Sequence, residues 1–232
     1  MADSAFFGGA ATPAVETTER SPRHSATVRV THWLVTVSFA GLLVSGIAIL
    51  LAHPRLYWGE TGGLGSPALV DLPLPLRLGQ SGWGRSLHFL CAWGCVLTGM
   101  VYVASGSLSG HFSKDLMPPR GILARSAMGQ PGDGGLFSYR LPQRVVYLVV
   151  VFLLFPLIVL SGLAMSPAIA SVIPQIVEAF GGQQSARTVH FVAACLSVLF
   201  VIVHVAMVCR GGFTQRMRGM ITGHIDPLET QK

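Results

Sequence analysis

Apolar residues along the chain gather into four long runs, and segments rich in polar residues, Gly and Pro separate them. The runs cover residues 30–52, 87–108, 145–165 and 188–209, and none of them contains Asp, Glu, Lys or Arg. A helix needs about 20 apolar residues to cross a hydrocarbon core of about 30 Å. The pattern therefore predicts an all-α protein, an integral membrane four-helix bundle with up-down-up-down topology.

The bundle domain is expected over residues 29–210, between a flexible N-terminal tail of residues 1–28 and a C-terminal tail of residues 211–232. The N-terminal tail is polar, carries Pro13 and Pro22, and leads into an apolar run that is long enough to span. A signal peptide has a shorter apolar core, with a cleavage site of small residues close behind it. We therefore expect an uncleaved first helix.

The composition agrees with a membrane protein, because 51% of the residues are hydrophobic and only 11% are charged. Twelve of the 16 Lys and Arg residues lie before the first run, after the fourth run, or between the second and third runs. The positive-inside rule then predicts that both termini face the cytoplasm. Because this topology accounts for the net charge of +6, we expect membrane lipid and no nucleic acid as a partner.

Four of the eight histidines lie inside the apolar runs, where an ionisable side chain is costly and usually has a partner or a function. They are His32, His88, His190 and His204. One such histidine alone could simply form a hydrogen bond between helices. Four of them at two matched depths favour a role as ligands.

Alternating helix direction sorts these histidines by depth. His32 begins the first run and His204 ends the fourth, so they form an inner pair toward the cytoplasm. His88 begins the second run and His190 begins the fourth, so they form an outer pair toward the opposite side. This pairing does not depend on the orientation of the protein in the membrane.

Two histidines at each depth suit the two axial positions of an iron porphyrin, whereas zinc and copper sites usually gather three or four ligands. His190 and His204 are 14 residues apart, which gives a rise of about 21 Å and azimuths within roughly 40°. The spacing therefore predicts two haem irons, one near each membrane face. The chain has no Cys-x-x-Cys-His motif, so we expect non-covalent haem b.

Small residues could make room for the porphyrins. Gly46 and Gly99 lie on nearly the same face as the histidine of their own run, at the depth of the other haem. Close helix packing accounts for glycines in a membrane bundle equally well. The third run has no histidine, and we assign it to packing, with a kink at Pro156 and a close contact at Ser161 and Gly162.

The order and spacing of several short segments resemble the four-helix di-haem cytochrome b membrane subunits. This group, the prokaryotic cytochrome b561-like proteins, includes the b-type subunits of nickel-iron hydrogenase and the gamma subunits of formate dehydrogenase. Besides His190 and His204, the matching segments are RVTHW at 29–33, SG at 45–46, RSLH at 85–88, SGLAM at 161–165 and MITG at 220–223.

The resemblance implies a quinone-linked electron conduit in the bacterial inner membrane. Residue by residue, His32 and His204 would hold the inner haem iron, and His88 and His190 the outer one. Quinone or quinol would exchange electrons near the inner haem, and a periplasmic oxidoreductase subunit, of molybdopterin or hydrogenase type, near the outer haem. The resemblance does not imply the direction of flow, nor whether the chain is itself an enzyme.

Two other functions stay open at this point. One is a stand-alone oxidoreductase of the same fold that passes electrons from superoxide, or another small donor, to quinone. The other is an assembly or transport subunit without haem. The presence of haem separates the second from the conduit.

Further candidate residues flank the runs. Arginines placed to neutralise haem propionates, or simply to snorkel, are Arg29 and Arg210 on the inner side and Arg85 and Arg187 on the outer side. Candidates for a quinone pocket are His24, His111 and Gln215.

The connection of residues 53–84 is long for this group. Its aromatic pair Tyr57-Trp58 suits an interfacial belt, and the segment could also be a docking surface for a soluble partner.

Overall fold

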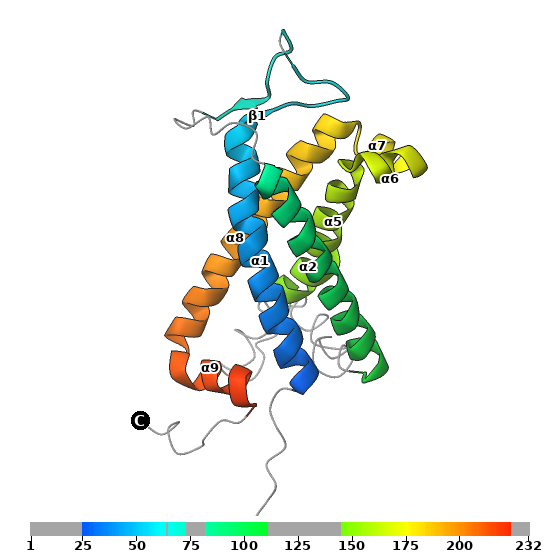
Figure 1. Ribbon diagram of the computed structural model, residues 1–232. Helices are drawn as coiled ribbons and strands as arrows, with labels where there is room; N and C mark the ends of the chain where they lie inside the picture. Colours follow the sequence, from blue (N-terminus) through cyan, green and yellow to red (C-terminus); the bar gives the residue numbers. More distant parts are fainter. Residues whose placement is uncertain (1–24, 64, 73–81, 111–144, 224–232) are drawn as a thin grey trace, which may run out of the picture.

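The computed structural model describes residues 25–63, 65–72, 82–110 and 145–223. Its main elements are four long helical spans: α1 (Ala26–Ala52), α2 (Gly82–Leu108), a third span over Val145–Ala164, and α8 (Gln183–Arg210). Successive spans run in opposite directions (Figure 1). All four are long and apolar enough to cross a membrane. The prediction of an integral membrane four-helix bundle is confirmed.

Three of the spans begin earlier than the apolar runs suggest. α1 begins at Ala26, α2 at Gly82 and α8 at Gln183, so that Arg29, Arg85 and Arg187 lie within the first two turns of their helices. A helix does not have to end where the hydrocarbon ends, because its backbone hydrogen bonds also form in the interfacial region. The arginines thus lie at the ends of the apolar runs, and the helices continue beyond them.

The third span changes its winding around Pro156. A π-helix, η2 (Val150–Leu154), leads directly into α5 (Phe155–Ala164), whose second residue is this proline. Proline has no N–H group, and its ring crowds the carbonyl four residues earlier. A π-helical turn is a known way in which a helix accommodates such a break. The irregularity expected at Pro156 therefore takes the form of a local π-helix.

The connections contain more structure than predicted. Residues Arg55–Leu56 and Val70–Asp71 form the antiparallel strands β1 and β2, with Arg55 opposite Asp71. Two short helices, α6 (Pro167–Val172) and α7 (Gln175–Ala179), join α5 to α8. We call the end of the bundle that carries these elements the outer end (Figure 1). At the opposite, inner end, α9 (Phe213–Thr222) follows α8 within the predicted C-terminal tail.

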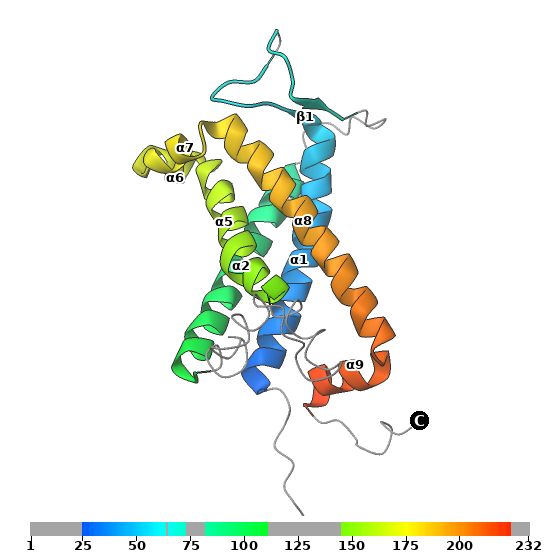
Figure 2. The same cartoon turned by 180° about the vertical axis from the view of Figure 1, so that it is seen from behind.

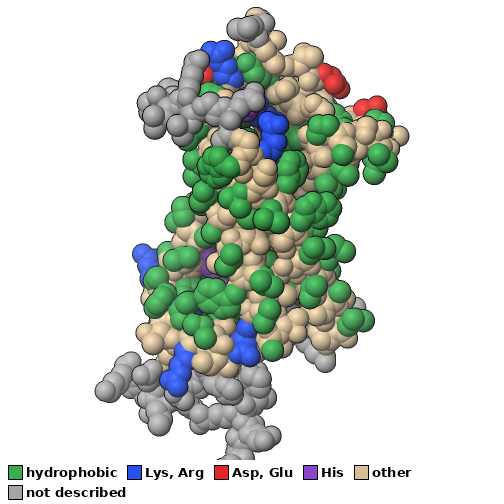
Figure 3. All heavy atoms as spheres, viewed as in Figure 1, with side chains coloured by type: hydrophobic (Ala, Val, Ile, Leu, Met, Phe, Trp, Pro, Cys, Tyr) green, Lys and Arg blue, Asp and Glu red, His purple; other side chains and the backbone are tan. Residues whose placement is uncertain are grey.

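The spans pack as two helical hairpins, α1 with α2 and α5 with α8. Figure 2, the view from behind, shows α8 crossing the bundle in front of α1 and α2. The buried residues of the spans are all small; they are Thr31, Ser45, Ala48, Gly84, Cys95, Thr98, Gly106, Ser161, Ala164, Ser185, Ala186, Thr188 and Ala193. Large apolar side chains cover the outside of the bundle (Figure 3). Small side chains thus fill the interior of the bundle, and its outer surface is hydrophobic, as expected of an integral membrane protein.

Candidate metal centres

The inner pair of histidines comes from the first and last spans. His32 lies near the inner end of α1 and His204 near the inner end of α8, and the centres of their rings are 6.4 Å apart at an angle of 48°. Both side chains are half-buried. The structure thus brings together the two histidines that the depth argument paired.

The outer pair comes from α2 and α8. The ring centres of His88 and His190 are 6.2 Å apart, at an angle of 64°. Both side chains are half-buried near the outer end. Because His190 and His204 lie on the same helix, α8 contributes one histidine to each pair.

Both separations fit one metal ion between two imidazole rings. A metal–nitrogen bond is about 2.0 Å long, and the nitrogen lies about 1.1 Å from the centre of a five-membered ring, so two rings on opposite sides of one ion have centres about 6.2 Å apart. Among the described residues, no cluster of three or more His, Cys, Asp or Glu side chains could hold a metal ion. Two histidine nitrogens at each level would suit a haem iron, whose porphyrin supplies the other nitrogens, rather than a site made by protein ligands alone.

Hydrogen bonds engage the Nδ1 atoms of three of these histidines. Ser45 Oγ lies 3.0 Å from His88 Nδ1, Ser161 Oγ lies 3.1 Å from His190 Nδ1, and Tyr147 Oη lies 3.1 Å from His204 Nδ1. Metal-binding histidines usually use their second ring nitrogen in this way, which fixes the ring and its tautomer. The Nε2 atoms of these three rings are the nitrogens that remain for a metal.

The third span therefore does more than pack, although it has no histidine. It carries Tyr147 at the inner level and Ser161 at the outer level, one hydrogen-bond partner for each pair. We predicted a close contact at Ser161 and Gly162, and their neighbour is the ring of His190. The sequence pattern did not single out Tyr147. The signal that could have found it is a tyrosine hydroxyl within an apolar run, because such a hydroxyl needs a hydrogen-bond partner.

The glycines differ in what they approach. A Cβ atom on Gly46 would lie 3.8 Å from Cε1 of His88, so this glycine of α1 is at the depth of the outer pair as expected. A Cβ on Gly99 would lie 3.1 Å from the ring of Phe155 on the third span. This contact supports close helix packing as the role of Gly99.

Residues 23–223 match the family described as prokaryotic cytochrome b561. This chain belongs to that family. It is also 31% identical over 209 residues to the putative protein-methionine-sulfoxide reductase subunit YedZ1 of Azospira oryzae, which covers 87% of this chain and 96% of that protein. The chain is thus a membrane haem protein of the cytochrome b561 type, which binds haem b and transfers electrons.

The arginines considered for the propionates of this cytochrome fall into two groups. Arg29 donates from Nη1 to the carbonyl of Ile221 at 2.9 Å, which ties α9 to α1, and Arg187 donates to the carbonyl of His53. Arg85 and Arg210 are exposed at the outer and inner ends.

The outer connection of the cytochrome is fixed to the start of α8. The carbonyl of Gly59 accepts from the backbone amides of Gln184 and Ser185, at 3.0 and 3.3 Å, and the Gly59 amide donates to Ser185 Oγ at 2.7 Å. Thr188 donates its hydroxyl to the carbonyl of Tyr57 at 2.7 Å. The free amides at the helix start thus find acceptors in this loop.

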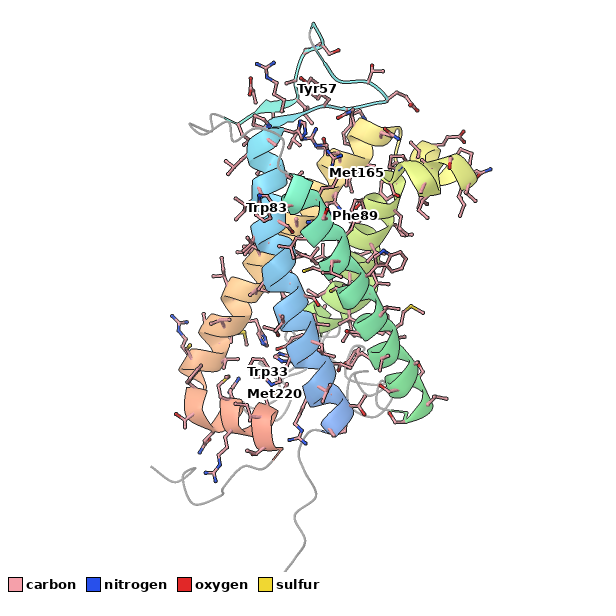
Figure 4. The ribbon with its side chains drawn as sticks, viewed as in Figure 1. Trp33, Tyr57, Trp83, Phe89, Met165 and Met220 are labelled. Atoms are coloured by element: carbon pink, nitrogen blue, oxygen red, sulfur yellow. The ribbon has the colours of Figure 1, made fainter. Side chains whose placement is uncertain are left out.

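The two aromatic residues of this loop have different surroundings. Tyr57 is buried at the outer end of the bundle (Figure 4), whereas the side chain of Trp58 is 62% exposed. Of the pair considered for an interfacial belt or a docking surface, Trp58 alone faces outward.

A polar pocket of about 300 Å³ lies beside the outer connection. Its lining includes His53, Arg55, Gln184 and Arg187. Burial, together with the nearby Arg187 and Arg85, lowers the pKa of His53. Arg187, in the lining of this pocket, lies about one helical turn before His190 on α8. The pocket therefore carries positive charge close to the outer pair.

The candidates for the quinone pocket have different outcomes. His24 and His111 lie outside the described residues. Gln215 is half-buried on α9 but does not line the inner pocket of about 340 Å³ between α1 and α9. That pocket is lined by Arg29, Trp33 and Met220, with Ala26, Val30, Leu34 and Ile221. Trp33 and Met220 lie side by side (Figure 4), and the indole N–H of Trp33 donates to the Met220 carbonyl at 3.2 Å.

Proposed function

We propose that this cytochrome holds two haem b groups and carries electrons across the inner membrane between the quinone pool and a periplasmic oxidoreductase. His32 and His204 are the ligands of the inner haem iron, and His88 and His190 those of the outer one. The two histidine pairs, with ring centres 6.4 and 6.2 Å apart at opposite ends of the bundle, carry this proposal. Bound haem supplies a one-electron carrier at each level.

The residues of the chain set the geometry of transfer. His190 and His204 are 14 residues apart on one continuous helix, so their levels differ by about 21 Å along its axis. Bound porphyrins would bring the two carriers closer together than this rise between their ligands. The helix α8 thus holds both centres at a fixed separation.

The distribution of charge supports a cytoplasmic inner end. All three acidic residues of the described part, Glu60, Asp71 and Glu178, belong to the outer connections, and acidic side chains appear only at that end in Figure 3. The described part of the inner end carries Arg210, Arg216 and Arg218 without an acidic residue. By the positive-inside rule this end faces the cytoplasm. The outer haem then lies toward the periplasm.

Electrons flow from quinol outward in this proposal. The relative from Azospira oryzae is named as a subunit of a putative reductase of protein methionine sulfoxide, and a reductase consumes electrons. A partner of that kind fits this chain better than a hydrogenase, which would supply electrons. The exposed Trp58, on a loop fixed to the helix of His190, is a contact point for such a partner.

The proposal is tested in proteoliposomes with a quinol analogue and ferricyanide, an impermeant oxidant, on the outer side. We expect quinol to reduce both haems and ferricyanide to reoxidise them. In His88→Ala, quinol still reduces the inner haem but the oxidant receives no electrons. If quinol reduces neither haem of the wild type, or if His88→Ala supports full oxidant reduction, the conduit is wrong.

The positively charged outer pocket favours one second candidate, a stand-alone superoxide:quinone oxidoreductase. A small anion could enter beside Arg187, close to the outer pair. Purified protein without any partner would then reduce quinone when superoxide is generated in the solution. Under the conduit proposal this reaction does not exceed the rate without protein.

A further inference from the structure

Two serines in different helical hairpins make the same set of contacts. On α1, Ser45 donates its hydroxyl to the carbonyl of Gly41 at 2.7 Å, and on α5, Ser161 donates to the carbonyl of Leu157 at 2.7 Å. A second carbonyl, one residue further along, lies 3.1 Å from each hydroxyl. A glycine follows each serine, Gly46 and Gly162.

These contacts determine which hydrogen bond each hydroxyl donates and which it accepts. A serine hydroxyl has one proton and two lone pairs, and here the proton is used within the serine's own helix. The oxygen can therefore only accept a hydrogen bond from the facing histidine, at 3.0 Å for His88 and 3.1 Å for His190. The proton of each neutral imidazole must then be on Nδ1.

For His190, a backbone carbonyl leads independently to the same tautomer. The carbonyl of Ile158 lies 2.9 Å from His190 Nδ1, and a carbonyl can only accept. With the proton on Nδ1, each ring of the outer pair keeps a lone pair on Nε2.

A glycine lies beside the ring in each case. A Cβ atom would lie 3.3 Å from His190 Cε1 at Gly162, which is tighter than ordinary contact, and 3.8 Å from His88 Cε1 at Gly46, which is ordinary contact. Each Ser-Gly pair therefore places an acceptor for Nδ1 and a glycine beside the same ring, and the close approach requires glycine only at Gly162.

We propose that Ser45-Gly46 and Ser161-Gly162 are duplicated positioning devices that hold His88 and His190 in the Nδ1–H tautomer, with Nε2 facing the outer metal position. In each hairpin, the first helix carries the Ser-Gly pair near its outer end and the second helix carries the histidine near its start. The outer site is thus an internal repeat. This inference rests on the proposed function only in taking the two Nε2 atoms as iron ligands.

The inner pair does not repeat this device. The partner of His204 Nδ1 is the hydroxyl of Tyr147, which can donate or accept. The serines therefore act on the outer site alone.

The test uses Ser45→Ala and Ser161→Ala, with Ser197→Ala as the matched control. Ser197 donates to its own helix at 2.8 Å, to the carbonyl of Ala193, so its variant loses the same intrahelical bond without losing a hydrogen bond to a ligand histidine. Full-length protein is purified, and the potentials and low-spin ferric EPR signals of both haems are measured. The outer haem is the one whose signals disappear in His88→Ala.

We expect each of the two serine variants to shift the EPR signal of the outer haem and to raise its midpoint potential, because a hydrogen-bond acceptor makes the imidazole more electron-donating. The affinity for the outer haem falls about 10- to 100-fold. The potential and EPR signal of the inner haem stay unchanged in these variants, and those of both haems stay unchanged in Ser197→Ala. The variants Ser45→Thr and Ser161→Thr keep the hydroxyl and restore the signals of the outer haem in part.

Two kinds of result would overturn the inference. In one, both variants retain two haems with potentials and EPR signals like those of the control. In the other, Ser45→Ala and Ser161→Ala shift different haems. A wild-type protein with fewer than two haems contradicts the proposed function instead, so the two failures are distinguishable.

Discussion

Gly162 and Gly46 lie beside equivalent histidines, but a methyl group would have less space at Gly162 than at Gly46. The two positions therefore provide a matched test at the scale of single residues. A methyl group on Gly162 would lie 3.3 Å from His190 Cε1, tighter than ordinary contact, whereas on Gly46 it would lie 3.8 Å from His88 Cε1. We expect Gly162→Ala to displace His190 and reduce occupancy of the outer haem several-fold. Gly46→Ala should retain it. Equal occupancy in both variants, measured by haem-to-protein ratio, would contradict this geometry.

Tyr147 gives a second residue-scale prediction, for the inner site. Its hydroxyl is the hydrogen-bond partner of His204 Nδ1, at 3.1 Å. Tyr147→Phe removes this partner without removing the ring that packs edge-on against Phe200. We expect the potential of the inner haem to shift while that of the outer haem stays constant in a redox titration. A shift in the potential of the outer haem alone would show that Tyr147 and His204 do not belong to the inner haem site.

The ligand candidates could be predicted from the sequence, but their hydrogen-bond partners could not. An imidazole such as that of His190 is conspicuous in an apolar run, because it is costly in lipid. The sequence indicates a close helix contact at Ser161, but not that this serine faces a histidine, because its hydroxyl can bond to its own helix. The sequence does not indicate that Tyr147 faces a histidine either, because its aromatic ring is compatible with an apolar environment. Only three-dimensional proximity reveals that they face histidines.

At the scale of elements, the contact between the outer connection and α8 supports a stability prediction. Thr188 is buried and donates to the Tyr57 carbonyl at 2.7 Å. Thr188→Val keeps the shape but leaves that carbonyl without its partner, at a cost of about 1–3 kcal/mol. Thr98→Val is the control, because the buried hydroxyl of Thr98 bonds to its own helix through Gly94. Thermal unfolding that is equal in both variants would contradict a stabilising role for this contact.

The four spans were predictable because uncharged apolar runs of this length are typical of membrane-crossing helices. The short elements were not, since contacts rather than periodicity stabilise them. The helix α9 forms in a polar tail, where Arg29 and Trp33 bind carbonyls at its end. Its flanking residues, Gly212 with φ +92° and Gly223 with φ +85°, are a helix-boundary signal that the sequence did contain.

At the scale of the whole molecule, His53 makes stability depend on pH. Burial and the neighbouring Arg187 and Arg85 lower the pKa of His53 in the folded protein below its ordinary value of about 6.5. As pH falls below about 6.5, the unfolded chain takes up a proton that the folded protein does not, so the free energy of unfolding decreases. We expect His53→Asn to lose less thermal stability than the wild type between pH 7.5 and 5.5. An identical loss of thermal stability in both proteins would contradict the lowered pKa of His53.

The membrane location and the cytochrome family were within reach of the sequence because composition and histidine depth are global properties of the chain. The physiological partner was not, because a docking surface depends on which side chains remain exposed after folding. Tyr57 and Trp58 are neighbours, yet the first is buried and the second is 62% exposed. The direction of electron flow is a property of two proteins together, and one chain does not contain it.

The most direct test of the central claim is the haem content of the purified protein, with reduced-minus-oxidised spectra of the four histidine variants. We predict two non-covalent b haems per chain in the wild type. His32→Ala and His204→Ala should lose one and the same haem, and His88→Ala and His190→Ala the other. A wild-type protein from a haem-replete host with one haem or none would contradict the account. So would the loss of different haems from His32→Ala and His204→Ala.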